Sequence, residues 1–283
     1  MPNSSRPRTP LRPKIGVFDS GVGGLTVLRA LVERIPDADY LYFGDTARLP
    51  YGSKSAATVA HYAVGAVRYL QDEGAELLVI ACNTATALAL KEIKAAAGVE
   101  VIGVVEPGAA AAAAASRTGK VVVIGTEATM ASHAYRRALE GLKVEVREKA
   151  CPLFVPLVEE GWVEHAVTEQ VARIYLAEAF SDDARDADVL VLGCTHYPLI
   201  KPLLRRVAPE HMAIVDSAES TARAVARQLQ IEALRPSAEA KSERRGVPVL
   251  KFFATDSAEK FRKLGTRFLG LPVEDVLLVD LKE

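Results

Sequence analysis

The feature that most constrains this chain is a pattern that occurs twice, with a cysteine at the same point each time. Residues 189–200 (V-L-V-L-G-C-T-H-Y-P-L-I) resemble residues 77–88 (L-L-V-I-A-C-N-T-A-T-A-L). In both, an apolar run of strand length ends at a cysteine, short polar residues follow, and a helix is predicted next. Cys82 and Cys194 are 112 residues apart (194 − 82). Two thiols in matching contexts predict one site built by both halves of the chain.

Two further segments recur in the same order and indicate an internal duplication. Residues 14–18 resemble residues 120–124 at a separation of 106, and Val105-Glu106 resembles Val215-Asp216 at a separation of 110. Small differences between these separations are what insertions in loops would produce. Each copy is therefore expected to build one α/β lobe.

Strands alternate with helices along most of the chain, which predicts parallel sheets of the doubly wound kind. In open parallel sheets, ligands bind beyond the carboxyl ends of the strands. Both repeated cysteines, Asp19, Ser20 and Thr126 fall at such ends. A cleft between two facing lobes would bring these residues together.

Proline and glycine determine the prediction for four less regular segments. Residues 45–55 are predicted to be a loop, and loops often carry function. Residues 106–108 are predicted to close a strand at residues 101–105. Residues 151–161 have two prolines in an apolar run and are predicted to be a shaped loop. Residues 236–246 are predicted to be a surface loop.

Composition narrows the class of protein. The 283 residues, 49% hydrophobic and 25% charged, are typical of a soluble globular chain with room for two domains. A net charge of −1 gives no electrostatic argument for a nucleic-acid partner. No apolar run is long enough to cross a bilayer, so no membrane partner is expected. Three cysteines do not form a disulfide framework, and the cytoplasm is the expected compartment. Residues 1–13 lack the apolar core of a secretory signal and are predicted to be a disordered leader.

The residues at the strand ends are suited to acid–base chemistry. A cysteine just before a helix lies where the helix dipole can lower the thiol pKa. Asp19 could act on one thiol as a base or fix its orientation, and His196 could do the same for the other thiol. Two thiols on opposite sides of a carbon acid would let one remove a proton while the other delivers one. The resulting anion needs preplaced donors at the substrate carboxylate. Suitable donors are Ser20, Asn83, Thr84 and Thr195.

Three other interpretations of these residues stay open. His196 could bind zinc with the two cysteines, although Cys-x-His offers no C-x-x-C pair. A Cys–His nucleophile for acyl transfer would leave the second cysteine unused. A cysteine at a strand end is often a plain core residue, and we interpret Cys151 in this way. The matching contexts of Cys82 and Cys194 favour the two-thiol hypothesis.

Five motifs in order make the chain similar to the bacterial glutamate racemases, within the cofactor-independent Asp/Glu racemase superfamily. The motifs are F-D-S-G-V-G-G-L-T-V (18–27), G-D-T-A-R-L-P-Y-G-S-K-S (44–55), A-C-N-T-A (81–85), C-P-L-F-V-P-L-V-E (151–159) and G-C-T-H-Y-P-L (193–199). The resemblance covers residues 14–270. Any one motif would be weak evidence, but five in this order are highly specific.

The resemblance implies two pseudo-symmetric α/β lobes, each a mostly parallel sheet flanked by helices, with the active site in the cleft between them. Residues 14–106 and 217–283 would form the first lobe, and residues 107–216 the second. The resemblance also implies a homodimer that needs no cofactor and no metal. Its activity would be the interconversion of L- and D-glutamate, supplying D-glutamate for peptidoglycan.

The resemblance further implies roles for individual residues. Cys82 and Cys194 would be the two acid–base groups, with Cys82 serving the α-proton of the D-enantiomer and Cys194 that of the L-enantiomer. Asp19 would assist Cys82, and His196, with Glu159 nearby, would assist Cys194. The expected substrate contacts are Asp19, Ser20, Tyr51, Gly52, Asn83, Thr84, Thr126, Thr195 and His196.

Two alternative functions follow from the same residues. A pair of cysteines does not set the length of the substrate side chain, so aspartate or another amino acid could be the substrate. By resemblance, residues 50–52 and Thr195-His196 favour glutamate. A non-catalytic amino-acid-binding regulator is the other alternative, and the presence of both cysteines, Asp19 and His196 argues against it.

Overall fold

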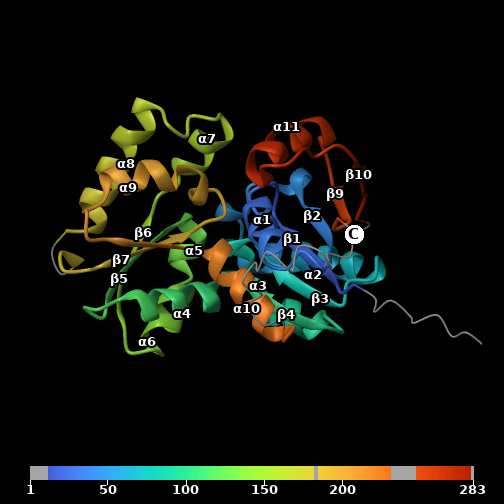
Figure 1. Cartoon of the computed structure of the whole chain (residues 1–283), viewed down its shortest axis with the longest axis horizontal. Coiled ribbons are helices and arrows are strands. Elements are labelled where there is room, and N and C mark those ends of the chain that lie inside the picture. The colour runs from blue at the N-terminus through green and yellow to red at the C-terminus, as the bar shows by residue number, and fades with distance from the viewer. Residues whose placement is uncertain (1–11, 182–183, 231–246, 282–283) are drawn as a thin grey trace, which may run out of the picture.

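The computed structural model describes residues 12–181, 184–230 and 247–281, which form two α/β lobes side by side (Figure 1). Every strand pair in these residues is parallel, and helices flank both sheets. The predicted fold class is therefore confirmed. The loop predicted at residues 236–246 lies outside the described residues, as do residues 1–11 of the predicted leader.

The first lobe is built on a six-stranded sheet of order β10-β9-β2-β1-β3-β4. Its strands are β1 (Lys14–Asp19), β2 (Asp39–Gly44), β3 (Leu77–Ile80), β4 (Glu100–Gly103), β9 (Leu250–Ala254) and β10 (Val276–Leu278). Its helices are α1 (Leu25–Arg34), α2 (Ala56–Asp72), α3 (Asn83–Ala96) and α11 (Ala258–Leu269). Alternate residues of β1 pack on opposite sides, with Val17 toward α1 and Phe18 toward α2 and α3. Both faces are thus covered, as parallel sheets require.

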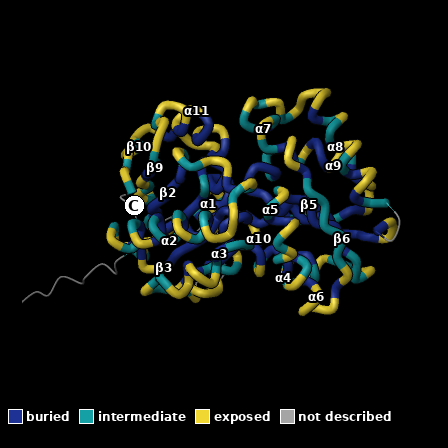
Figure 2. The backbone as a smooth tube through the Cα atoms, turned by 180° about the vertical axis from the view of Figure 1, so that it is seen from behind, coloured by how far each residue is buried: buried dark blue, intermediate teal, exposed yellow. Residues whose placement is uncertain are grey.

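The second lobe is built on a four-stranded sheet of order β6-β5-β7-β8. Its strands are β5 (Lys120–Gly125), β6 (Glu145–Ala150), β7 (Val189–Gly193) and β8 (Ala213–Asp216). The helices are α4 (Val105–Ala115), α5 (Glu127–Ala131), α6 (Ala134–Glu140), α7 (Phe154–Glu159), α8 (Ala166–Ala179) and α9 (Lys201–Val207). One apolar cluster joins Leu25 and Leu28 of the first lobe to Leu190 and Leu192 of the second. The two lobes therefore share a continuous core, and the strands β1, β3, β5 and β7 are almost entirely buried, whereas β6 and β10 are not (Figure 2).

The order β2-β1-β3-β4 in the first lobe matches β6-β5-β7-β8 in the second, as an internal duplication predicts. The third sequence correspondence was misplaced, because Val105 and Glu106 lie in α4 while Val215 and Asp216 lie in β8. The equivalent positions are the residues before α4 and α10 (Ser217–Gln228), Val104 and Asp216. They are 112 residues apart (216 − 104), the same separation as the two cysteines.

Two segments predicted to be irregular are helical. Residues 106–108 lie in the first turn of α4, and the preceding strand already ends at Gly103. Residues 154–159 form α7 within the predicted loop of residues 151–161. In both helices the proline, Pro107 or Pro156, is the third residue, where its missing N–H leaves no helical hydrogen bond unmade. The loop at residues 45–55 contains two short 3₁₀ turns, Thr46–Arg48 and Tyr51–Ser53.

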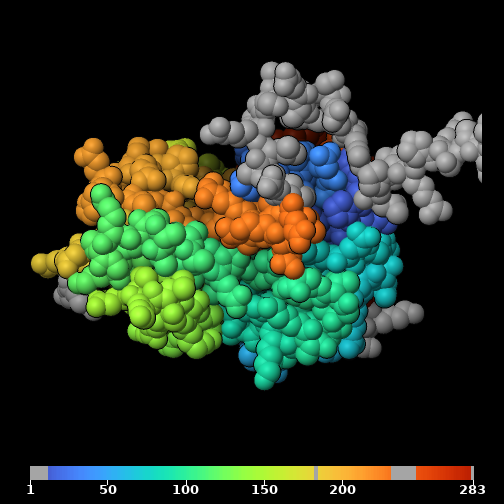
Figure 3. Space-filling model, turned by 60° about the horizontal axis from the view of Figure 1, so that its bottom comes forward, coloured from blue at the N-terminus to red at the C-terminus, as the bar shows by residue number. Residues whose placement is uncertain are grey.

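The end of the described chain returns to the first lobe. Strand β9 pairs with β2, and β10, which the sequence did not predict, pairs with β9. Helix α10 packs against α1 and α4, and Figure 3 shows it in orange at the surface where the lobes meet. The predicted boundary at residues 106/107 falls inside α4, and the exact lobe boundaries remain a prediction.

Arg12 and Pro13, assigned to the leader, contact the first lobe. The Arg12 Nε lies 3.2 Å from Asp39 Oδ1, and the Pro13 carbonyl accepts a hydrogen bond from the Asp39 N–H. Among the helices of the described residues, none has the length and apolar character needed to span a bilayer.

Candidate active site

A cavity of about 440 Å³ lies between the lobes, beyond the carboxyl ends of β1, β3, β5 and β7. The residue after each of these strands, or the next one along, lines it. All but one of the predicted site residues line the cavity: Ser20, Tyr51, Gly52, Cys82, Asn83, Thr84, Thr126, Glu159, Cys194, Thr195 and His196. The exception is Asp19, which is 1% exposed and is not among the lining residues. The chain thus brings both repeated cysteines to one cavity.

Cys82 caps the N-terminus of α3. The Cys82 Sγ accepts a hydrogen bond from the Ala85 N–H at 3.4 Å and donates one to Ser20 Oγ at 3.4 Å. Burial, and then the nearby carboxyl of Asp19, raise the pKa of Cys82 to about 12, although the contacts with Ser20 and Ala85 oppose this. The expectation of a helix-lowered pKa is wrong for Cys82, because desolvation outweighs the helix terminus. Cys82 is a neutral thiol at pH 7.

Asp19 lies behind the cavity at the end of β1. Its Oδ2 accepts a hydrogen bond from the Gly21 N–H at 2.9 Å, whereas its buried Oδ1 has no hydrogen-bond partner within the described part of the chain. Burial raises the pKa of Asp19, while His196 and the Gly21 N–H oppose the rise. Gly24 allows the start of α1 to approach, since a Cβ there would lie 2.6 Å from the Asp19 Cβ. A buried carboxylate oxygen without a partner is suited to a ligand donor.

Cys194 belongs to a chain of three side chains. The His196 Nδ1 lies 4.0 Å from the Cys194 Sγ, and the His196 Nε2 lies 3.2 Å from Glu159 Oε1. Burial alone would lower the pKa of His196, but the contacts with Cys194 and Glu159 outweigh it and raise this pKa to about 10. The hydrogen bond to His196 in turn lowers the pKa of Glu159. A protonated His196 would stabilise negative charge on the Cys194 sulfur.

Three threonines join the lobes at the floor of the cavity. Thr84 Oγ1, on α3, lies 3.0 Å from Thr126 Oγ1 and 3.2 Å from Thr129 Oγ1. Thr126 caps the N-terminus of α5, so two helix N-termini from different lobes meet here. Free N–H groups at such termini bind anions. The floor is therefore suited to carboxylate groups without a basic side chain.

The side chains of Asn83 and Tyr51 are already engaged. Asn83 Oδ1 accepts a hydrogen bond from the Tyr135 hydroxyl, and its Nδ2 donates to Ser217 Oγ. The Tyr51 hydroxyl donates to Asp45 Oδ2 at 2.6 Å, so it is directed into the first lobe. Both residues line the cavity, but the hydroxyl of Tyr51 is not available to a substrate.

Several lining residues were not among the predicted site residues: Leu49, Pro50, Ser53, Glu127, Pro152, Val155, Pro156 and Lys260. Val155, Pro156 and Glu159 are spaced as one face of a helix, a signal that was available once α7 was recognised. Lys260, on α11, had no sequence signal because it reaches the cavity only through the tertiary fold. Cys151 is fully buried and does not line the cavity. Over the described residues, no group of three His, Cys, Asp or Glu side chains is placed to hold a metal ion.

Replacing Gly23 by alanine is expected to lower kcat/KM by about 10- to 100-fold, since small displacements of catalytic groups are costly. A Cβ at Gly23 would lie 2.3 Å from Thr195 Oγ1 and 2.5 Å from His196 Nδ1, so both side chains must move. Gly65→Ala is the matched control. Among the described residues, a Cβ there would meet Leu281 alone, at 3.8 Å, and alanine in α2 should stabilise the fold by about 0.5–1 kcal/mol with unchanged activity. Equal activity in the two variants would contradict the packing described here.

Comparison with known families agrees with the fold and with the paired strand-end cysteines. The family model described as Asp/Glu/hydantoin racemase matches residues 15–225. The chain belongs to the Asp/Glu/hydantoin racemase family.

Within that family, the similar relatives are glutamate racemases. The curated glutamate racemase of Koribacter versatilis is 61% identical over 285 residues, covering 95% of this chain and 98% of the relative. A glutamate racemase structure from Bacillus anthracis matches with a TM-score of 0.85 and 36% identity, covering 95% of this chain and 98% of that one. A Francisella tularensis glutamate racemase in complex with D-glutamate matches with a TM-score of 0.83 and 35% identity over the same shares. The predicted resemblance to glutamate racemases, and with it an isomerase that acts as an amino-acid racemase, is confirmed.

Proposed function

We propose that the protein interconverts L- and D-glutamate by proton transfer at the α carbon between Cys82 and Cys194. One structural observation supports this proposal independently of the family comparison. Two buried free cysteines, from equivalent positions of the two repeats, line one cavity together. This arrangement is suited to a substrate that must be deprotonated on one face and protonated on the other. An aspartate racemase and a non-catalytic regulator are not favoured, because the relatives at high identity are glutamate racemases.

The protonation states support one direction of reaction from the resting protein. Cys82, with its pKa raised to about 12, holds a proton that it can deliver. His196, whose pKa is raised and which Glu159 holds, lies 4.0 Å from the Cys194 Sγ, where it would stabilise the negative charge that develops on this sulfur as it removes the α-proton. In this state the protein is ready for the enantiomer whose α-proton faces Cys194. By the family assignment, that enantiomer is L-glutamate.

The polar groups around the cavity fit the three charges of glutamate. Asp19 Oδ1, which is buried behind the cavity lining and has no partner among the described residues, is the proposed acceptor for the substrate ammonium. The N-termini of α3 and α5 offer N–H groups to the carboxylates, together with Thr84 and Thr126. Negative charge that develops at the α-carboxylate during proton removal would be stabilised by the same preplaced donors.

The cellular role is also part of this proposal. The D-glutamate formed would supply peptidoglycan synthesis, and the protein would act in the cytoplasm as a homodimer. Size-exclusion chromatography with light scattering tests the dimer, and a particle of about 30 kDa, the monomer mass, would contradict it.

Chiral chromatography of reactions with L-glutamate and with L-aspartate tests the function. The purified protein with reduced thiols should convert L-glutamate to an equal mixture of enantiomers. L-Aspartate should react at least about 100-fold more slowly, because a missing methylene displaces a carboxylate from its donors. A metal chelator and the absence of added cofactor should leave the rate unchanged. Conversion of aspartate alone would overturn the choice of substrate, and conversion of neither would overturn the enzymatic function.

A further inference from the structure

Helix α11 belongs to the first lobe but contacts the acid–base residues of the second. It follows β9, which pairs with β2, and it packs against α1. Figures 1 and 2 both show α11 and α7 facing each other from opposite lobes. Three side chains of α11 contact α7 or His196: Lys260, Arg267 and Phe268.

Arg267 makes its contacts at the carboxyl end of α7. Its guanidinium donates hydrogen bonds to the carbonyl of Glu159 at 3.1 Å and to that of Val158 at 3.4 Å. The last carbonyls of a helix lack helical partners, and a cation there is favourable. Gly161, with φ of +84°, provides the space, because a Cβ would lie 2.8 Å from the Arg267 Nη1. The sequence thus provides both the donor and the room for it.

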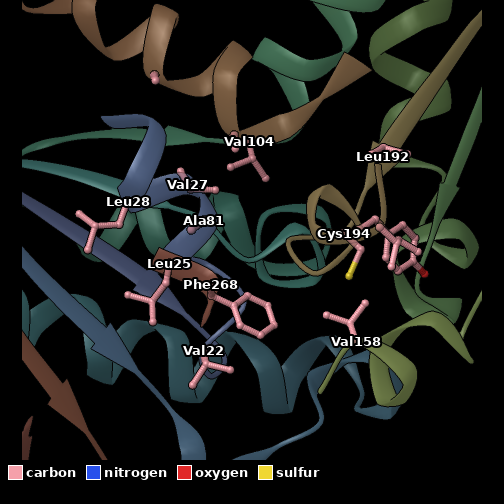
Figure 4. Packing of buried hydrophobic residues seen from close by; sticks show 14 of the residues in the cluster. Val22, Leu25, Val27, Leu28, Ala81, Val104, Val158, Leu192, Cys194 and Phe268 are labelled. Atoms are coloured by element: carbon pink, nitrogen blue, oxygen red, sulfur yellow. The ribbon is translucent and has the colours of Figure 1, made fainter. Parts of the chain in front are cut away.

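The other two side chains of α11 contact the same pair of acid–base residues. The Lys260 Nζ lies 3.6 Å from Glu159 Oε2. The buried ring of Phe268 lies 5.0 Å from the His196 ring in an edge-on arrangement at 80°. Figure 4 shows this ring pointing toward Val158 and Cys194. Helix α11 therefore contacts the backbone and the carboxylate of Glu159, and the ring of His196, from the opposite lobe.

We propose that Arg267 is a positioning residue that fixes the carboxyl end of α7 across the cleft, so that Glu159 stays bonded to His196. The inference rests on the two-thiol reaction proposed above. Arg267 touches no reacting atom and acts only through Glu159 and His196. Its influence should therefore fall mainly on the proton transfer at Cys194, which His196 contacts, and reach Cys82 only through the weaker effect of His196 and Glu159 on Asp19.

Arg267→Met tests this, because methionine keeps much of the side-chain length and loses the donors. We expect kcat/KM to fall about 5- to 30-fold, with partial recovery in Arg267→Lys. Arg262→Met is the matched control, since Arg262 is exposed on the same helix and makes no hydrogen bond or ion pair in the described part of the chain. Thermal unfolding of each variant, followed by circular dichroism, separates loss of fold from loss of activity.

Primary deuterium isotope effects give the readout that a purely structural role would not change. If transfer at Cys194 becomes slower, the isotope effect on kcat/KM rises with L-[2-²H]glutamate and falls with D-[2-²H]glutamate. Equal isotope effects in Arg267→Met and the unmodified protein, despite racemisation by both, would overturn the positioning role alone. Absence of racemisation in the unmodified protein would instead overturn the proposed function.

Discussion

Replacing either Cys82 or Cys194 by serine is expected to lower kcat/KM for racemisation by at least about 10³-fold, equivalent to about 4 kcal/mol of barrier. A serine hydroxyl is far too weak an acid to exchange protons with a carbon acid as a thiol does. Because the equilibrium constant between enantiomers is one, kcat/KM must fall equally in both directions. Initial rates with L- and D-glutamate, followed by polarimetry, measure the effect.

Serine should preserve the fold at these positions. At Cys82 it keeps an acceptor for the Ala85 N–H and thus the cap of α3. Cys151→Ser is the matched control, because Cys151 is also buried and its Sγ contacts the Lys149 carbonyl, away from the cavity lining. Its activity should stay within about threefold of the unmodified protein. More than a tenth of normal activity in Cys82→Ser or Cys194→Ser would defeat the two-thiol mechanism.

Asp19→Asn is the second substitution with a large expected effect, a fall in kcat/KM of about 10²- to 10³-fold. Asparagine keeps the volume and an oxygen for the Gly21 N–H, but it cannot carry charge at the unpartnered Oδ1 position. Both the proposed bond to the substrate ammonium and the assistance to Cys82 would be lost. Steady-state kinetics should show a raised KM together with a lowered kcat.

A buried carboxylate elsewhere provides the comparison for Asp19. Asp188 accepts hydrogen bonds from Ser116, Arg117 and Thr118, and it precedes β7 at the end of the sheet opposite the cavity. Asp188→Asn should lower the midpoint of thermal unfolding and leave kcat unchanged. If Asp19→Asn behaved in the same way, with stability lost and kcat kept, Asp19 would be a structural residue only.

Sequence alone predicted what depends on local pattern. The cysteine strands recur in context, and a parallel sheet brings its strand ends to one edge, so the pairing of Cys82 with Cys194 followed from the repeat. The helix α7 was missed because Pro156 was taken as a breaker, although proline in a first turn costs no hydrogen bond. The third correspondence was misplaced because two short apolar-acidic pairs matched by chance.

Properties set by tertiary packing could not be predicted in this way. The helix that begins at Asn83 suggested a lowered pKa for Cys82, but burial and the nearby Asp19 raise this pKa instead. Tyr51 lies in a loop that lines the cavity, yet Asp45, six residues earlier, binds its hydroxyl. The contact of Arg267 with Glu159 joins residues 108 positions apart, and no local pattern encodes it.

The origin of the hydrogen at the α carbon tests the central claim most directly. L-Glutamate would be incubated with the unmodified protein in heavy water, and both enantiomers analysed by mass spectrometry after less than a tenth has reacted. Two thiols on opposite faces predict D-glutamate that carries one deuterium from the first turnover, while the remaining L-glutamate stays unlabelled. D-Glutamate that retains the hydrogen of the substrate would show that one group serves both faces, and would contradict the account.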